Sequence, residues 1–132
     1  MIVEYRAELA DALPENRRRF MNQLRLTPGR RYEVHGVSVF DQMVFVLVVD
    51  DIDTDAFCLA AAFRVVDGSI PQGWVCTPSD GVVQFVLGPP FLAASVETYN
   101  TFLDRGDREQ LNEFWRYLDA RRRIDTHDDV EE

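Results

Sequence analysis

The sequence has no lysine, and all fourteen of its basic residues are arginine. We interpret this bias as codon usage in a GC-rich bacterial genome. Against the arginines stand 23 acidic residues, which give a net charge of −9. Because clustered cations supply most of a protein's affinity for nucleic acid, this balance predicts a surface that repels nucleic acids and anionic membranes. The same charge favours encounter with a basic protein partner, although it also serves solubility.

Cysteine and histidine are scarce, with two of each. Cys58 and Cys76 both have apolar neighbours, so we expect buried, reduced thiols in a cytosolic protein. A single disulfide between them is the alternative. No Cys-x-x-Cys pair or Cys/His cluster occurs, which argues against a structural zinc site, and we predict no cofactor.

Long apolar runs are absent: the longest covers residues 43–49, far short of the roughly 20 residues of a membrane-spanning helix. Glu4 and Glu8 interrupt the N-terminus, so no secretory signal is expected, and we predict a cytoplasmic protein. Gly-rich phosphate loops, G-x-S-x-G and H-E-x-x-H are also missing, so an enzyme is the minority interpretation.

What the sequence does contain is a strand-rich segment, residues 31–87. Its apolar phase shifts by one residue after Gly36, which predicts a β-bulge there. Asp41 and Gln42 predict a tight turn. The run 43–49 is apolar at every position, which is typical of a central strand covered on both faces.

Further strands recur at intervals of about ten residues. Residues 56–66 predict a strand with an irregular middle at 60–62, where the alanines could instead form a turn of helix. Residues 74–77 and 82–87 predict a hairpin. We therefore expect a small, curved antiparallel sheet of about five strands, with an SH3-like barrel as its more specific form.

Helices are expected on either side of this sheet. The spacing of apolar residues predicts a short first helix near the N-terminus, with a strand as the alternative, and then a helix over residues 14–24. Ser95 is expected to cap a helix over 96–103, and Asp107 a second helix. The fold class is thus α+β, with a single domain over 1–124 and an acidic, disordered tail over 125–132.

The acidic loop 50–55 is the sharpest candidate site. Asp51, Asp53 and Asp55 have the D-x-D-x-D spacing that opens an EF-hand calcium loop. The required glycine and glutamate are replaced by Ala56 and Ala62, so we do not predict a metal site. We interpret the loop as a surface for a basic partner.

The complete set of predicted partner-binding residues is Asp50, Asp51, Asp53, Asp55 and His35. His35 and Cys58 could pair as base and nucleophile, but we interpret them as a strand histidine facing water or a partner and a core cysteine, and predict no catalytic residue.

The predicted function is a non-enzymatic, acidic protein-binding domain, for example an immunity-type neutraliser of a basic toxin. Two alternatives remain. One is an enzyme or small-ligand protein with a pocket between sheet and helices, and the other is a homodimeric interaction module.

Overall fold

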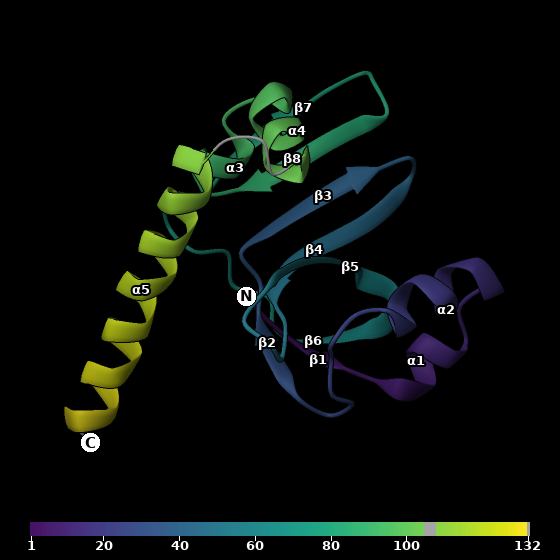
Figure 1. Ribbon diagram of the computed structural model, residues 1–132, viewed down its shortest axis with the longest axis horizontal. Helices are drawn as coiled ribbons and strands as arrows, with labels where there is room; N and C mark the ends of the chain where they lie inside the picture. Colours follow the sequence, from purple (N-terminus) through teal and green to yellow (C-terminus); the bar gives the residue numbers. More distant parts are fainter. Residues whose placement is uncertain (105–107, 132) are drawn as a thin grey trace.

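The computed structural model describes residues 1–104 and 108–131, with side chains up to Arg121. The described residues form two antiparallel sheets, one short 3₁₀ helix (η1) and five α-helices (Figure 1). The strands are β1 (Ile2–Tyr5), β2 (Arg31–Glu33), β3 (Gly36–Phe40), β4 (Met43–Val49), β5 (Asp55–Leu59), β6 (Phe63–Asp67), β7 (Val75–Pro78) and β8 (Val83–Gly88). The helices are α1 (Ala7–Asp11), α2 (Glu15–Asn22), η1 (Ala60–Ala62), α3 (Pro90–Ala93), α4 (Val96–Asp104) and α5 (Arg108–Glu131).

The α+β class is confirmed, but the strands do not form the single sheet that we predicted. The strand order is β2-β1-β6 in a three-stranded sheet and β5-β4-β3-β8-β7 in a five-stranded sheet. These sheets do not close into a barrel, so the SH3-like form is not confirmed. Of the helices in the described ranges, none has both the length and the apolar character of a membrane span.

The predicted bulge at Gly36 is wrong, because the chain changes sheets there instead. The Val34 N–H donates to the Met1 carbonyl in the first sheet (2.8 Å), and the His35 N–H donates to Leu47 in the second (2.8 Å). From Gly36 onward, β3 pairs with β4 without a shift in register. Tyr32 and Val34 are buried in the core between the sheets and Val37 packs against the same core, so the phase shift accompanies the change of sheet and not a change of core.

The N-terminus is a strand, so the predicted first helix is wrong over residues 2–5. Val3 and Tyr5 are buried between the sheets while Glu4 faces outward, which is the alternation of a strand. The helix expected over residues 14–24 is confirmed as α2, which begins directly after Pro14.

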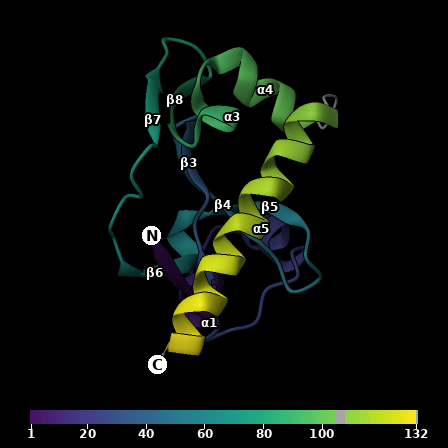
Figure 2. The ribbon, with the colours of Figure 1, turned by 90° about the vertical axis from the view of Figure 1, so that its left-hand side faces the viewer.

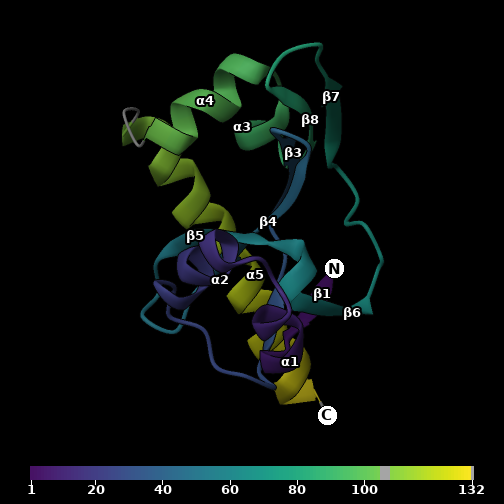
Figure 3. The ribbon, with the colours of Figure 1, turned by 90° about the vertical axis from the view of Figure 1, so that its right-hand side faces the viewer.

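Strand β4 is interior to its sheet, as predicted, and its two faces contribute to two cores. Val46 and Val48 pack into a core between the two sheets, which helices α1 and α2 close at one side. Leu47 faces a second core beneath α3, α4 and α5. Figures 2 and 3 show these three C-terminal helices gathered on one side of the five-stranded sheet and α1–α2 on another. The prediction fails only at Val44, which is 45% exposed.

The C-terminal helices follow the predicted pattern with one addition, the short α3. The Ser95 hydroxyl accepts a hydrogen bond from the Thr98 N–H (3.0 Å), so the predicted cap of α4 is confirmed. Phe114 and Leu118 anchor α5 in the second core. The predicted cap Asp107 lies outside the described residues. The last turns of α5 include residues of the predicted tail, whose disorder stays a prediction.

Candidate functional site

The loop between β4 and β5 is the surface that we predicted to bind a partner. The side chain of its first residue, Asp50, hydrogen-bonds to the backbone of the loop. Asp50 is 8% exposed, and its Oδ1 accepts hydrogen bonds from the N–H groups of Ile52 (3.0 Å) and Thr54 (2.9 Å). Its own N–H donates to the Thr54 carbonyl (2.9 Å). Such Asx contacts shape a turn. Asp50 therefore stabilises the loop conformation and presents little charge to a partner.

Asp51 joins this loop to the turn that precedes β2. Its carboxylate accepts hydrogen bonds from the hydroxyls of Thr27 (2.6 Å) and Tyr32 (2.7 Å) and from Arg30 (2.7 Å). Burial opposes ionisation, but the hydrogen bonds and the Arg30 charge outweigh it and hold the pKa of Asp51 below its ordinary value. The Asp51 carboxylate thus makes its hydrogen bonds within the protein.

We expect Asp51→Asn to lower the free energy of unfolding at neutral pH by about 1 kcal/mol, since charged hydrogen bonds become neutral ones. A carboxylate with a lowered pKa stabilises the fold above its unfolded pKa, and that stability is lost as pH falls through the folded pKa. The difference between wild type and variant should therefore shrink below about pH 4. Urea unfolding from pH 7 to pH 3 measures it, with the exposed Asp80→Asn as control. An equal difference at all pH values would contradict the role given to this carboxylate.

We expected His35 to face water or a partner. In the structure its side chain is covered by α5. Its ring lies edge-on to Phe114 and Tyr117, with centroid separations of 6.0 Å and 5.6 Å. Its Nδ1 lies 3.5 Å from the Tyr117 hydroxyl and 3.9 Å from the Glu33 carboxylate. Since the residue is only 5% exposed, it packs α5 against the sheet and presents little surface to a partner.

A cleft of about 210 Å³ brings three of the five predicted residues together, namely Asp50, Asp53 and His35. Its other lining residues are Arg30, Arg31, Tyr32, Glu33, Val49, Leu118 and Arg121. Asp51 and Asp55 do not line it, although Asp55, at the start of β5, is paired across the sheet with Val49, which does.

The charges of this cleft compensate one another. Arg30 pairs with Asp51 (2.7 Å), Arg31 faces Glu4 (3.7 Å), and Arg121 pairs with Glu33. Three guanidinium groups and three carboxylates, those of Glu33, Asp50 and Asp53, line the cleft, so it has no excess of negative charge to attract a basic partner. We therefore interpret the cleft as a structural junction between β2, the 50–55 loop and α5, and not as a binding site for cationic groups.

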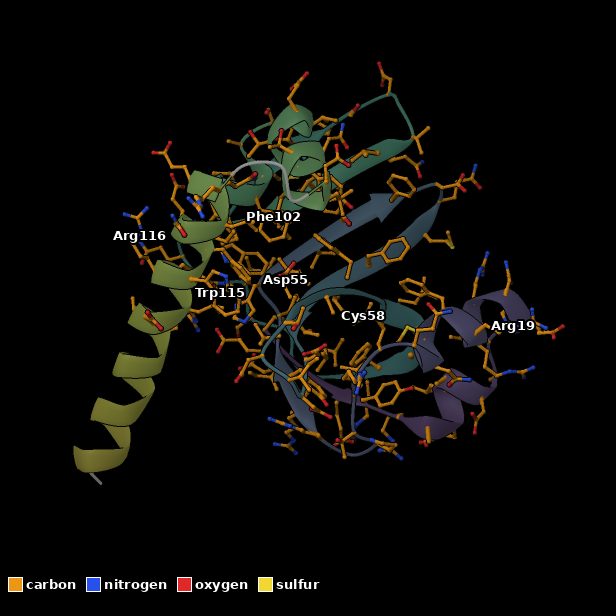
Figure 4. The ribbon with its side chains drawn as sticks, in the orientation of Figure 1. Arg19, Asp55, Cys58, Phe102, Trp115 and Arg116 are labelled. Atoms are coloured by element: carbon orange, nitrogen blue, oxygen red, sulfur yellow. The ribbon has the colours of Figure 1, made fainter. Side chains whose placement is uncertain are left out.

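The pairing of His35 with Cys58 is not supported by the structure. Cys58, labelled in Figure 4, is fully buried in the core between the sheets, whereas the His35 ring packs against Phe114 and Tyr117 of α5. Burial, helped by the charge of Asp50, raises the pKa of the Cys58 thiol to about 12. The thiol therefore stays protonated at neutral pH and is a poor nucleophile.

Our expectation that both cysteines are buried is wrong for Cys76. Cys76 is exposed on β7, an edge strand, rather than buried. Both thiols are free, so the alternative disulfide is not formed. Among the side chains that the structure describes, no three His, Cys, Asp or Glu residues converge as a metal site would require.

Sequence reasoning missed an acidic hollow between α4 and α5, with a volume of about 460 Å³. Glu97 projects into it from the first turn of α4, and Glu109 and Glu113 from consecutive turns of α5. Its remaining lining residues are Pro90, Phe91, Thr98, Thr101 and Gln110. The i, i+4 spacing of Glu109 and Glu113 was a signal in the sequence, but only the packing of α5 places Glu97 beside them.

Gln110 fixes the geometry of this hollow. Its side-chain amide donates to the carbonyls of Phe91 and Thr98, both at 2.7 Å, and so ties α5 to α3 and α4. The three carboxylates therefore belong to two helices, α4 and α5, whose relative position is fixed by the hydrogen bonds of Gln110. Pre-formed surfaces of this kind lose little conformational entropy on binding.

A comparison of the chain with protein-family models, with curated proteins and with solved structures finds no significant match. Its function has to be inferred from the geometry of its own residues.

Proposed function

We propose that this chain is a non-enzymatic protein-binding domain that docks a basic protein on the face formed by α4 and α5. The observation that carries the proposal is the hollow lined by Glu97, Glu109 and Glu113. In residues 68–132, acidic residues outnumber arginines two to one, whereas the two are closer to balance in residues 1–67. Five of the twelve acidic residues in 68–132 lie in residues 125–132, so this excess falls mainly at the C-terminal end of the chain, and the proposal rests on the hollow itself.

Carboxylates of the N-terminal half are already paired with arginines: Glu4 with Arg6 (3.0 Å) and Arg64 (3.3 Å), and Glu15 with Arg19 (2.5 Å). Carboxylates paired in this way attract a basic partner weakly, which disfavours that part of the surface for docking.

A small-ligand protein or an enzyme is the less favoured function. The cleft beside His35 holds about 210 Å³, below the roughly 300–1,000 Å³ of ordinary ligand sites, and the hollow between α4 and α5, at about 460 Å³, is lined by three carboxylates where such sites are mostly apolar. Cys58 is a protonated core thiol at neutral pH. An immunity-type protein that neutralises a basic toxin remains a concrete instance of the proposed function.

The test is to capture partners from the native cell with the immobilised chain, identify them by mass spectrometry and measure binding of the purified partner by calorimetry. We expect a basic partner whose affinity falls as salt is raised from about 0.05 M to about 0.5 M, because screening weakens exposed charge contacts. Glu97→Gln combined with Glu113→Gln should weaken binding about tenfold at low salt.

The matched control is Asp11→Asn combined with Asp80→Asn, which changes the net charge equally at two exposed sites elsewhere. It should alter the affinity by less than about threefold, since it changes only the long-range field. Binding that is insensitive to salt, or that both double variants weaken equally, would contradict docking on α4 and α5.

A further inference from the structure

One face of the five-stranded sheet has no helix packed on it over strands β3, β4, β7 and β8. Directly opposite residues of antiparallel strands point to the same face of a sheet, so the registers assign the side chains to faces. On this face, one row consists of Val44, Val39, Phe85 and Pro78, and the next row includes Leu87 and Cys76. Figure 3 shows α3 and α4 on one side of β3 and β8, and β7 with the connection 68–74, but no helix, on the other.

The apolar side chains of these two rows lie outside both cores. The three-stranded sheet covers this face as far as Val37, which packs against the core between the sheets. Val39, Phe85 and Leu87 are half-buried by their neighbours in the sheet, and Val44 is 45% exposed, yet none of them belongs to either core that the described residues form. Because a sheet buries its apolar face against a second layer, these rows lack the layer that would cover them.

The segment that contributes β7 and β8 is nearly free of charge. From Gly68 to Val96 the chain has one charged residue, Asp80, whereas 28% of all its residues are charged. Much of this segment is at the surface. Five of the ten large apolar side chains that are exposed among the described residues lie within residues 65–82, namely Val65, Val66, Ile70, Val75 and Val82. Exposed apolar residues in a region depleted of charge are typical of the centre of a protein–protein interface.

The distribution of charge indicates what covers these rows. A basic partner finds no carboxylate in them and is attracted instead to the hollow between α4 and α5, helices that pack on the other face of the sheet. Two copies of a chain with net charge −9 repel each other, so they associate best through a surface without charge. A symmetric contact joins the same patch on both subunits, and an uncharged apolar patch complements itself.

We propose that two copies of this chain pack face to face through β3, β4, β7 and β8 and form a symmetric dimer. The rows that contain Val44, Phe85 and Leu87 meet the same rows of the second copy, as the two sheets of a β-sandwich do at a separation of about 10 Å. The hollow between α4 and α5 stays open on the outer side of each copy. This inference is independent of the proposed function, because it uses a different face for a different partner.

Sedimentation velocity of the full chain, from about 1 µM to about 500 µM, tests the dimer. We expect a concentration-dependent dimer with a Kd between about 1 µM and about 100 µM, since a face of four short strands is smaller than a standard interface. Raising NaCl from about 0.05 M to about 0.5 M should lower this Kd at least about threefold, because salt screens the repulsion between the copies. Binding of the proposed basic partner changes with salt in the opposite direction, which separates the two contacts.

Matched variants locate the interface. Val44→Glu places a charge in the first row and should raise the Kd of the dimer at least about tenfold. Ile52→Glu adds the same charge in the loop between β4 and β5, at a residue that is 58% exposed, and should change the Kd by less than about threefold. Val44→Thr keeps a β-branched side chain and should raise the Kd about threefold. Thermal unfolding shows which variants retain the fold, and Val44→Thr replaces Val44→Glu if the latter does not.

The native thiol of Cys76 reports on the same face. Cys76 is exposed in the second row, whereas the buried Cys58 is protected in each copy. Labelling of Cys76 with a bulky maleimide, followed by mass spectrometry, should slow at least about fivefold when most of the chain is dimeric, because thiol reactivity depends on access. Val44→Glu should restore the fast rate at the same concentration.

Several results would overturn the inference. They are a monomer at every concentration and both salt levels, a dimer that Val44→Glu and Ile52→Glu weaken equally, and a dimer in which Cys76 is labelled as fast as in the monomer. If a protein captured from the native cell slows the labelling of Cys76 in a monomeric chain, the face belongs to that protein instead of a second copy. Conversely, the expected dimer without any salt-dependent basic partner would contradict the proposed function alone.

Discussion

Replacing Phe114 by alanine is expected to lower the free energy of unfolding by about 3–5 kcal/mol, the usual cost of deleting a buried ring. Phe114 is fully buried, and its ring lies 5.4 Å from that of Phe102 and 5.5 Å from that of Phe91. It also covers His35, with a centroid separation of 6.0 Å. Its removal would therefore loosen the contacts of α5 with α3, with α4 and with the sheet at once.

Urea unfolding followed by far- and near-ultraviolet circular dichroism measures this effect. Arg116→Ala is the control, because Arg116 is exposed on the same helix and should cost no more than about 0.5 kcal/mol. If the two variants were equally stable, α5 would not be packed into the second core. The same result would remove the hollow between α4 and α5, because Glu109 and Glu113 reach it only from a docked α5.

Local patterns predicted most of the elements of this fold. The apolar run Met43–Val49 is an interior strand because its two faces pack into separate cores, as a run without alternation implies. Asp41 and Gln42 form the expected turn and both have positive φ angles, of 49° and 63°, as a two-residue hairpin turn requires. Such signals are contained within a few neighbouring residues.

The arrangement of the strands in two sheets could not be predicted in the same way. Val34 and His35 are adjacent in sequence, yet their N–H groups donate to Met1 in one sheet and Leu47 in the other. No local preference distinguishes that crossing from a bulge. The N-terminal strand was ambiguous for a similar reason, since its apolar residues fit both periods and pairing with β2 and β6 decides between them.

The candidate sites show the same limit. The sequence reveals a concentration of aspartates at residues 50–55, but it does not show that Asp50 and Asp51 are held by Thr54, Thr27 and Tyr32. The hollows of the surface are assembled from distant segments, as the acidic hollow is from α4 and α5. Composition alone therefore does not reveal which carboxylates lie side by side.

Gly36→Ala is expected to lower the free energy of unfolding by about 3 kcal/mol, the upper end of the cost of overpacking. A Cβ at this position would overlap Cδ2 of Leu92, a fully buried side chain of α3 that would have to shift to make room. Gly88 makes the same close approach from β8, with its ideal Cβ 3.3 Å from Gly36 Cα. Glycine at this position thus lets α3 pack directly on the sheet.

A double-mutant cycle separates this steric cause from a loss of backbone flexibility. Leu92→Ala alone should cost about 2–5 kcal/mol, but the cavity that it leaves can accept the new methyl group of Gly36→Ala. The double variant should therefore be more stable than the sum of the single effects by at least about 1 kcal/mol. Gly81→Ala is the control, since its nearest neighbour, Ser79 Oγ, is 3.8 Å from the ideal Cβ and the change should be nearly neutral. Strictly additive effects of Gly36→Ala and Leu92→Ala would mean that α3 does not rest on Gly36.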